Sequence, residues 1–322
     1  MLTTQTRTYP TVSSGILRLK SDPSHVVGQL LVTPILTHAD SFFGAEVSGV
    51  DWSQTIPESL VKELVALQDK YGVLVFRKTG MDNNRHIAFS HQLGSKLEVN
   101  PFYYGKENDR VREDYLWDVG NMELDGTPDS SYHQERSKYS LLLSHGNPVQ
   151  GGSWTHFADT RQAYADLPEE KKAMLEDLII EHEQVPSSSL TTHKAYFVPD
   201  YGTLKALKPP AFHKLVQTGP DGRKVLYLAA HAKQVVGWDL EKSQKLIWEL
   251  IHWCTQPKYV FSMEWHDGGD MVWWDNRQSM HRANPYTANM TARDVRRATV
   301  IDDGPLAFGV TAEEVKDAES KA

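Results

Sequence analysis

Short apolar runs bounded by turn-forming residues recur along the chain and predict a fold built mainly of β-strands. The run VLVFR, at 73–77, alternates too little for a half-exposed strand, so we expect a strand there that is buried on both faces. In the run 270–275 two tryptophans stand side by side, and neighbouring residues of a strand face opposite ways. We therefore expect one of Trp273 and Trp274 in the core and the other outside or at an interface. The remaining runs lie at residues 139–144, 224–230 and 258–265.

Helical spacing is restricted to a few segments. Between residues 58 and 71 the leucines 60, 64 and 67 share one helical face, and Gly72 follows where a C-terminal cap would stand. Residues 167–183 and 239–254 also predict helices. Many short strands with a few helices predict an α+β, mainly β fold: a β-sandwich or double-stranded β-helix (jelly roll) with packing helices.

The chain has no internal repeat and no low-complexity linker, which favours one compact domain. We expect a polar N-terminal arm at residues 1–30, a single jelly-roll domain at 31–308, and an acidic, helix-prone tail at 309–322.

Composition excludes several classes of partner. The 34 basic and 42 acidic residues give a net charge of -8, which argues against nucleic acid as a partner. No apolar run approaches the ~18 residues of a membrane span. The single cysteine, Cys254, excludes a disulfide framework and fits a reducing compartment, so we expect a cytoplasmic protein. The Ser/Thr-rich, acid-poor opening is also compatible with a transit peptide, although only one arginine precedes residue 18. A homo-oligomer is compatible with the sequence, but the sequence does not determine the oligomeric state.

The most informative stretch, WDNRQSMHRANPY followed by RDVRRATV, places a histidine and two arginines near one strand end. His281 follows a predicted strand and a turn, a position from which a side chain can point into a barrel mouth. Arg293 and Arg297 are four residues apart, so in a strand they face the same side, whereas Arg296 is expected at the surface. Since guanidinium groups bind carboxylates through two hydrogen bonds, this pattern predicts a site for a small dianionic acid.

These motifs resemble the distal half of the iron(II)/2-oxoglutarate-dependent dioxygenases of the taurine and 2,4-dichlorophenoxyacetate dioxygenase type. Three further segments agree with that family in order and spacing, so the resemblance runs from about residue 30 to about residue 308. They are FFGAEVSGVDWS, YGVLVFRKTGMD and GGSWTHFADTRQAYADLP.

The resemblance implies a set of site residues. His281 is similar to the family's distal histidine ligand of iron(II), and Asp129 to its metal aspartate. Arg293 stands where the family binds the far carboxylate of the cosubstrate 2-oxoglutarate, and Thr155 where a hydroxyl often joins it. Arg297 resembles a second arginine near the substrate's acidic group or the cosubstrate. Two histidines and one carboxylate on one face of the iron leave positions for 2-oxoglutarate and dioxygen.

One expected ligand is missing from this pattern. The family carries His-x-Asp, and counting back from KYSLL places Asp129 on the aspartate but Thr127 on the histidine. Three explanations remain open. A segment could be lost through splicing or a faulty gene model; His133 and Glu135 could replace the pair; or the chain could be a natural pseudoenzyme.

The sequence therefore predicts an oxygenase that hydroxylates a small, anionic organic substrate with release of succinate and CO2. The alternative from another class is a catalytically silent jelly-roll protein that binds an acid through Arg293. A cupin-like isomerase is disfavoured, because it would need more clustered histidines on strands. The identity of the substrate cannot be read from the loops that would select it.

Overall fold

Strands predominate in the computed structural model, as the apolar runs predict. It describes residues 25–38, 41–99, 111, 113–119, 134–146, 154–183, 209–266, 268–283 and 293–321. The helices are α1 (Glu58–Tyr71), α2 (Asn83–Gln92), α3 (Thr160–Ala165), α4 (Glu169–Leu175), α7 (Leu240–Cys254), the 3-10 helix η1 (Pro257–Tyr259) and α8 (Ala312–Lys321). The strands are β1 (His25–Val27), β2 (Leu30–Thr37), β3 (Phe42–Ser48), β4 (Val73–Phe76), β5 (Trp117–Asp118), β6 (Ser137–Gly146), β7 (Trp154–Asp159), β8 (Ile179–His182), β9 (Ala211–Lys214), β10 (Val216–Thr218), β11 (Lys224–Leu226), β12 (Ala232–Val235), β13 (Val260–Glu264), β14 (Met271–Asp275), β15 (Ser279–Ala283) and β16 (Asp294–Ile301).

A large sheet and a small sheet pack face to face. The large sheet has the strand order β1-β2-β3-β4-β14-β6-β16-β5, and the small one the order β13-β7-β15. Only β3 and β4 run parallel within these sheets. Side chains from both sheets interdigitate in one apolar cluster, called here the inner core. Its buried members are Leu36, Phe43, Val73, Val75, Leu142, Phe157, Phe261, Met263, Trp265, Val272, Trp274 and Val295.

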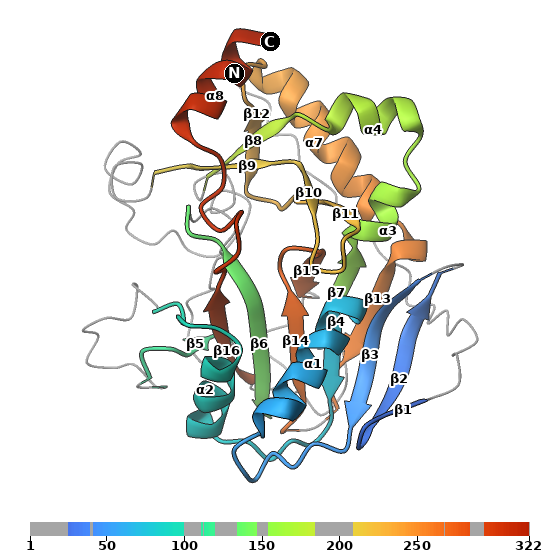
Figure 1. The fold of residues 1–322 in the computed structure, drawn as a ribbon, viewed down its shortest axis with the longest axis vertical. Helices are drawn as coiled ribbons and strands as arrows, with labels where there is room; N and C mark the ends of the chain where they lie inside the picture. Colours follow the sequence, from blue (N-terminus) through green and yellow to red (C-terminus); the bar gives the residue numbers. More distant parts are fainter. Residues whose placement is uncertain are drawn as a thin grey trace.

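Helices cover the opposite face of the large sheet, where α1 and α2 lie across its strands (Figure 1). The α1 leucines at 60, 64 and 67 are buried against strand residues such as Leu74 and Leu141. Gly72 ends α1 in the left-handed conformation, at φ 72°, and its N–H donates to the Gln68 carbonyl. The leucine spacing and the cap predicted from the sequence are therefore confirmed.

A second group of elements lies at one end of the sheets, where Figure 1 shows α3, α4 and α7 beside the smaller strands β8 to β12. These elements share their own apolar cluster, which includes Ile180, Leu215, Leu246 and Leu250. The edge strand β1 begins at His25, inside the segment that the sequence assigns to the N-terminal arm. No helix within the described ranges is long and apolar enough to cross a membrane.

The structure corrects two predicted elements. The helix expected at 167–183 ends at Leu175, because the β-branched pair Ile179 and Ile180 enters β8 and pairs with strands on both sides. The strand expected at 224–230 ends at Leu226. In the first segment pairing with β9 and β12 set the boundary, whereas the second pairs only with the neighbouring β10, over three residues.

The tryptophan pair is a further correction. Trp273 and Trp274 are both buried, with exposures of 0% and 1%, and neither lies outside. They do face opposite ways, since Trp273 packs under the helices and Trp274 packs in the inner core. Both are covered because the large sheet is sandwiched between helices and a second sheet.

We expect acid to destabilise the folded protein through His86, which lies on the helix-covered side of the large sheet. This ring on α2 is fully buried, and its Nε2 lies 3.2 Å from the Leu141 carbonyl oxygen. Burial, with a smaller effect of His145, lowers the pKa of His86 from 6.5 to about 3. Between these values the unfolded chain takes up a proton that the folded chain does not, so stability falls as pH falls from 6.5. We expect His86→Gln to reduce the slope of unfolding free energy against pH, between pH 6 and 4, by up to about 1.4 kcal/mol per unit.

Chemical denaturation at several pH values measures this slope. Replacing the exposed His91 on the same helix by glutamine provides the control, and the two variants should differ. Equal slopes for wild type and His86→Gln would contradict the prediction.

Candidate active site

His281 lies in the middle of β15 rather than just beyond a strand end, which corrects the position expected from the sequence. It pairs with Phe157 of β7, and its ring centroid is 6.4 Å from that of Phe157. The Trp274 ring is closer, with centroids 4.7 Å apart. Both neighbours belong to the inner core, so the imidazole faces the space between the two sheets.

Thr155 shares that face of the small sheet. It stands two residues before Phe157 on β7, and side chains two apart in a strand point the same way. Its hydroxyl is 3% exposed and accepts a hydrogen bond from the indole N–H of Trp265, at 3.0 Å. His156, between them in sequence, points to the other face and bonds Ser262.

The turn that leads into β15 is fixed by its own side chains. Asp275 accepts from the backbone and side-chain nitrogens of Arg277, each at 2.9 Å. Burial by itself would lower the pKa of Arg277, but the Asp275 carboxylate raises it above its usual range. Asn276 accepts from the Trp274 indole at 2.8 Å and donates to Ser140 at 2.9 Å. The WDNR motif therefore holds the tryptophan against which His281 packs.

Arg297 faces the inner core from the large sheet. On β16 it pairs with Leu142 of β6 and with Trp117 of β5, and paired residues project from the same face of a sheet. Its guanidinium carbon lies 5.1 Å from the centroid of the Trp117 ring. Arg297 is 5% exposed and Trp117 is fully buried. The cation is thus held against an aromatic ring inside the molecule.

Arg293 precedes β16, where a register shift between Asp294 and Val295 breaks simple alternation. The direction of the Arg293 side chain therefore has to be taken from its contacts rather than from strand alternation. The guanidinium is 5% exposed, and its Nη1 lies 3.5 Å from the carbonyl oxygen of Val119, a residue that packs against the inner core. Arg293 and Arg297 are therefore both buried and approach the inner core, but Arg293 does so from just before β16, so the expected placement of both in one strand is wrong.

Arg296 takes the opposite side, as its position in the strand predicts. It bonds Asn83 of α2 and forms an ion pair with Asp294 at 3.1 Å, on the helix-covered side of the sheet. The surface position expected for Arg296 is therefore wrong, because α2 covers this face of the sheet and leaves the side chain only 17% exposed.

Buried polar groups beside these arginines make no hydrogen bond in the part of the chain that the structure describes. They are the indole N–H of Trp117 and the hydroxyls of Ser144 and Thr299. Ser144 pairs with Val295, and Thr299 lies two residues from Arg297 on the same face. An unsatisfied buried polar group costs about 1–3 kcal/mol, so such groups favour a polar ligand. A small acid with several acceptor oxygens suits this set of donors and cations.

The expected carboxylate ligand cannot be placed, because Asp129, Thr127 and His133 lie outside the described residues. Glu135 is described, and its carboxylate forms an ion pair with Lys96. That contact does not favour the replacement of the lost ligands by His133 and Glu135. Within the described ranges no three His, Cys, Asp or Glu side chains gather as a metal site.

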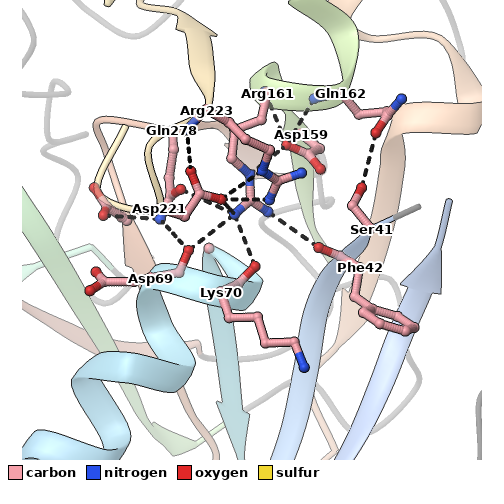
Figure 2. Close-up of polar contacts among 12 residues, drawn as sticks. Ser41, Phe42, Asp69, Lys70, Asp159, Arg161, Gln162, Asp221, Arg223 and Gln278 are labelled. Carbon is pink, nitrogen blue, oxygen red and sulfur yellow. Dashed lines mark hydrogen bonds and ion pairs between the residues drawn. The ribbon is translucent and has the colours of Figure 1, made fainter. Parts of the chain in front are cut away.

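A fully buried arginine joins the elements around this site. Figure 2 shows the Arg161 guanidinium at the centre of a network that includes the Asp159 carboxylate at 3.0 Å and the Gln278 amide oxygen at 3.1 Å. It also donates to the backbone carbonyls of Asp69 and Lys70, in the last turn of α1. These bonds satisfy carbonyls that have no partner within the helix. Because Gln278 immediately precedes β15, the network ties α1 and β7 to the strand of His281.

Three supporting residues were missed from the sequence: Trp117, Trp265 and Asn276. Trp117 and Trp265 contact predicted site residues on strands distant in the chain, whereas Asn276 bonds Trp274, two residues before it. Their residue types carried a signal, since a buried tryptophan usually finds a partner for its N–H. That partner becomes known only when the strands are paired.

Comparisons with known proteins agree with this architecture. The model of the family "Taurine catabolism dioxygenase TauD, TfdA family" matches residues 32–299. The chain is 32% identical over 281 residues to the alpha-ketoglutarate-dependent 2,4-dichlorophenoxyacetate dioxygenase of Cupriavidus pinatubonensis, covering 81% of this chain and 95% of that protein. It is 29% identical to the (S)-phenoxypropionate/alpha-ketoglutarate-dioxygenase of Sphingobium herbicidovorans, over 77% of this chain and 88% of that protein.

A solved structure gives the same result. The crystal structure of AAD-2 in complex with Mn(II) and N-oxalylglycine matches with a TM-score of 0.71 and 32% identity, covering 86% of this chain and 98% of that one. The strand-rich α+β fold and the family match together define a class of enzymes that depend on α-ketoglutarate, which is 2-oxoglutarate. The chain belongs to the TauD, TfdA family of these dioxygenases. The resemblance read from the four motifs is confirmed at this level.

Proposed function

We propose that this protein is an iron(II)/2-oxoglutarate-dependent oxygenase that hydroxylates a small organic acid, with release of succinate and CO2. One observation carries the proposal: His281 and Thr155 on the small sheet, and Arg293 and Arg297 on the large sheet, all face the inner core. We further infer that the two sheets are the two halves of a jelly roll, as the family membership implies.

The buried cations assign the ligand-binding roles. Arg293 and the Thr155 hydroxyl would bind the far carboxylate of 2-oxoglutarate, since a guanidinium matches a carboxylate bidentately. Arg297, held against Trp117 at 5.1 Å, would bind the substrate's acidic group together with the indole N–H. Both carboxylates would lie among apolar side chains, where water competes weakly with these hydrogen bonds.

Asp129 and His281 would hold the metal. Bound iron(II) supplies the oxidising chemistry with dioxygen, and the protein positions the reactants. Trp274, fixed by Asn276, packs against the His281 ring with centroids 4.7 Å apart and so supports its position. The inner-core aromatic side chains exclude water from the same space.

The substrate class follows from the relatives. Two of them are named for 2,4-dichlorophenoxyacetate and (S)-phenoxypropionate, which are aryloxy carboxylic acids. We therefore propose an organic acid of this size as the substrate. Release of succinate that requires iron(II), 2-oxoglutarate and 2,4-dichlorophenoxyacetate together would support this function. Absence of succinate with all three present would instead favour the silent acid-binding protein.

Thr127 makes that second function a specific alternative, because it stands where the family has its first metal histidine. We propose that the absence of this histidine, which the sequence pattern favours as the loss of a segment, weakens the metal site. Loss of even a supporting residue of a metal ligand costs about 10–100-fold in affinity or activity, and loss of a ligand should cost more. We expect Thr127→His to tighten iron(II) binding by more than about 10-fold, measured by anaerobic calorimetry.

A histidine introduced at Ser131, equally far from Asp129 on its other side, is the matched control and should not tighten binding. Micromolar or tighter iron(II) binding by the wild-type protein, together with full 2-oxoglutarate turnover, would show that another residue has replaced the missing ligand.

A further inference from the structure

The indole N–H of Trp265 determines which hydrogen-bonding role remains open to the Thr155 hydroxyl. A threonine hydroxyl can both donate and accept a hydrogen bond, whereas the indole N–H of tryptophan only donates. At 3.0 Å from the indole nitrogen, the Thr155 oxygen must therefore be the acceptor of this bond. Its single proton then points elsewhere and remains available to an acceptor. Among the described residues, the indole is the only hydrogen-bond partner of this hydroxyl.

Trp265 is itself held firmly in place. Its indole belongs to the inner core and is 4% exposed. The residues before and after Trp265 are both hydrogen-bonded. The Glu264 carbonyl accepts from Arg77 at 2.9 Å. The His266 N–H donates to the Asp270 carboxylate at 3.1 Å. Arg77 and Asp270 form an ion pair at 2.7 Å, so one polar network fixes both neighbours of the indole. A side chain anchored in this way can orient another with little loss of conformational entropy.

We infer that Trp265 is a positioning residue for the 2-oxoglutarate site: it makes Thr155 a dedicated hydrogen-bond donor toward the far carboxylate. This inference rests on the proposed function, in which Thr155 and Arg293 bind that carboxylate. An ionised carboxylate only accepts hydrogen bonds, so a hydroxyl whose proton is directed toward it binds it better than a freely rotating one. The benefit comes from preorganisation, because Trp265 acts only through Thr155.

A double-mutant cycle tests this inference by the affinity for 2-oxoglutarate, measured by calorimetry in the presence of Mn(II) to prevent turnover. Trp265→Phe keeps an aromatic ring but removes the N–H, and should weaken binding roughly 3- to 10-fold, the range of one neutral hydrogen bond. Thr155→Val should weaken it by at least as much. In the Thr155→Val background, Trp265→Phe should have no further effect, since the hydroxyl it orients is gone.

Trp273→Phe is the matched control. Trp273 is fully buried, but its indole N–H has no hydrogen-bond partner among the residues that the structure describes, and it packs on the helix-covered side of the sheet. This substitution should leave the affinity for 2-oxoglutarate unchanged. Equal losses in Trp265→Phe and Trp273→Phe would mean a general packing effect and would overturn the inference.

The remaining outcomes separate the inference from the function. If Thr155→Val weakens binding and Trp265→Phe does not, the positioning role is wrong while the function stands. If Thr155→Val and Arg293→Leu both leave binding unchanged, the proposed function itself fails. Should Trp265→Phe not fold, the Nε1–H resonance of Trp265 in the wild-type protein and in Thr155→Val gives a second measurement. An unchanged resonance in Thr155→Val would exclude the hydrogen bond.

Discussion

Replacing Arg293 by leucine is expected to abolish most of the affinity for 2-oxoglutarate. Truncating one partner of a buried, hydrogen-bonded charge pair costs about 2–5 kcal/mol, which corresponds to at least about 30-fold in the dissociation constant. Arg293 is 5% exposed, so water can replace the lost guanidinium only poorly. Arg293→Lys keeps the charge but loses the two-pronged geometry, and should retain part of the affinity. Calorimetry with Mn(II) and 2-oxoglutarate measures these changes.

Arg296→Leu is the control for charge. It removes a nearby cation, but one that bonds Asn83 and Asp294 on the other face of the sheet. Its affinity for 2-oxoglutarate should equal that of the wild type. If the Arg293→Leu and Arg296→Leu variants bind 2-oxoglutarate equally tightly, Arg293 does not bind the cosubstrate and the proposed site is wrong.

Replacing Arg161 by methionine is expected to lower the free energy of unfolding by about 3–5 kcal/mol, the cost of leaving a buried charge without its partner. The charge left behind is Asp159, which is fully buried. Burial alone would raise the pKa of Asp159, but Arg161 and, to a smaller extent, His38, whose Nε2 lies 3.5 Å from the carboxylate, outweigh it and hold the pKa at about 2. The substitution also removes donors from the final carbonyls of α1, drawn at the centre of Figure 2.

The pH dependence of this loss gives a second test. A carboxylate with a lowered pKa stabilises the fold above about pH 4, its unfolded value, and this contribution is lost as pH falls toward 2. The difference in unfolding free energy between wild type and Arg161→Met should therefore be largest near neutral pH and should shrink below pH 4. Denaturant unfolding at pH 7 and pH 3 measures it.

Two further variants check the cause. Arg223, a second arginine in Figure 2, forms an ion pair with Asp221, but its side chain is 34% exposed. Arg223→Met should therefore lower the free energy of unfolding by less than about 1 kcal/mol. Asp159→Asn should recover part of the stability of Arg161→Met, because it removes the stranded charge. No recovery would show that the hydrogen bonds of Arg161, rather than its ion pair, account for the loss.

Much of the local structure could be predicted because it depends on neighbouring residues. The leucine spacing and Gly72 predicted the extent of α1, and the uninterrupted apolar run predicted that of β4. The inward direction of Arg297 followed from its place in a strand. Segment 167–183 shows the limit: its apolar positions fit a helix, yet Ile179 and Ile180 join β8 because two partner strands were available.

By itself, the sequence determined the strand-rich α+β class, the family, and the residue types of the proposed acid-binding site, since these depend on periodicity and on motifs of adjacent residues. Only the tertiary structure decided what surrounds each side chain. It buried both members of the tryptophan pair, placed His281 within a strand, and brought Trp265 to Thr155 and Trp117 to Arg297. The physical reason is that the pairing of strands and the packing of sheets join residues distant in the chain, and no local pattern records which ones meet.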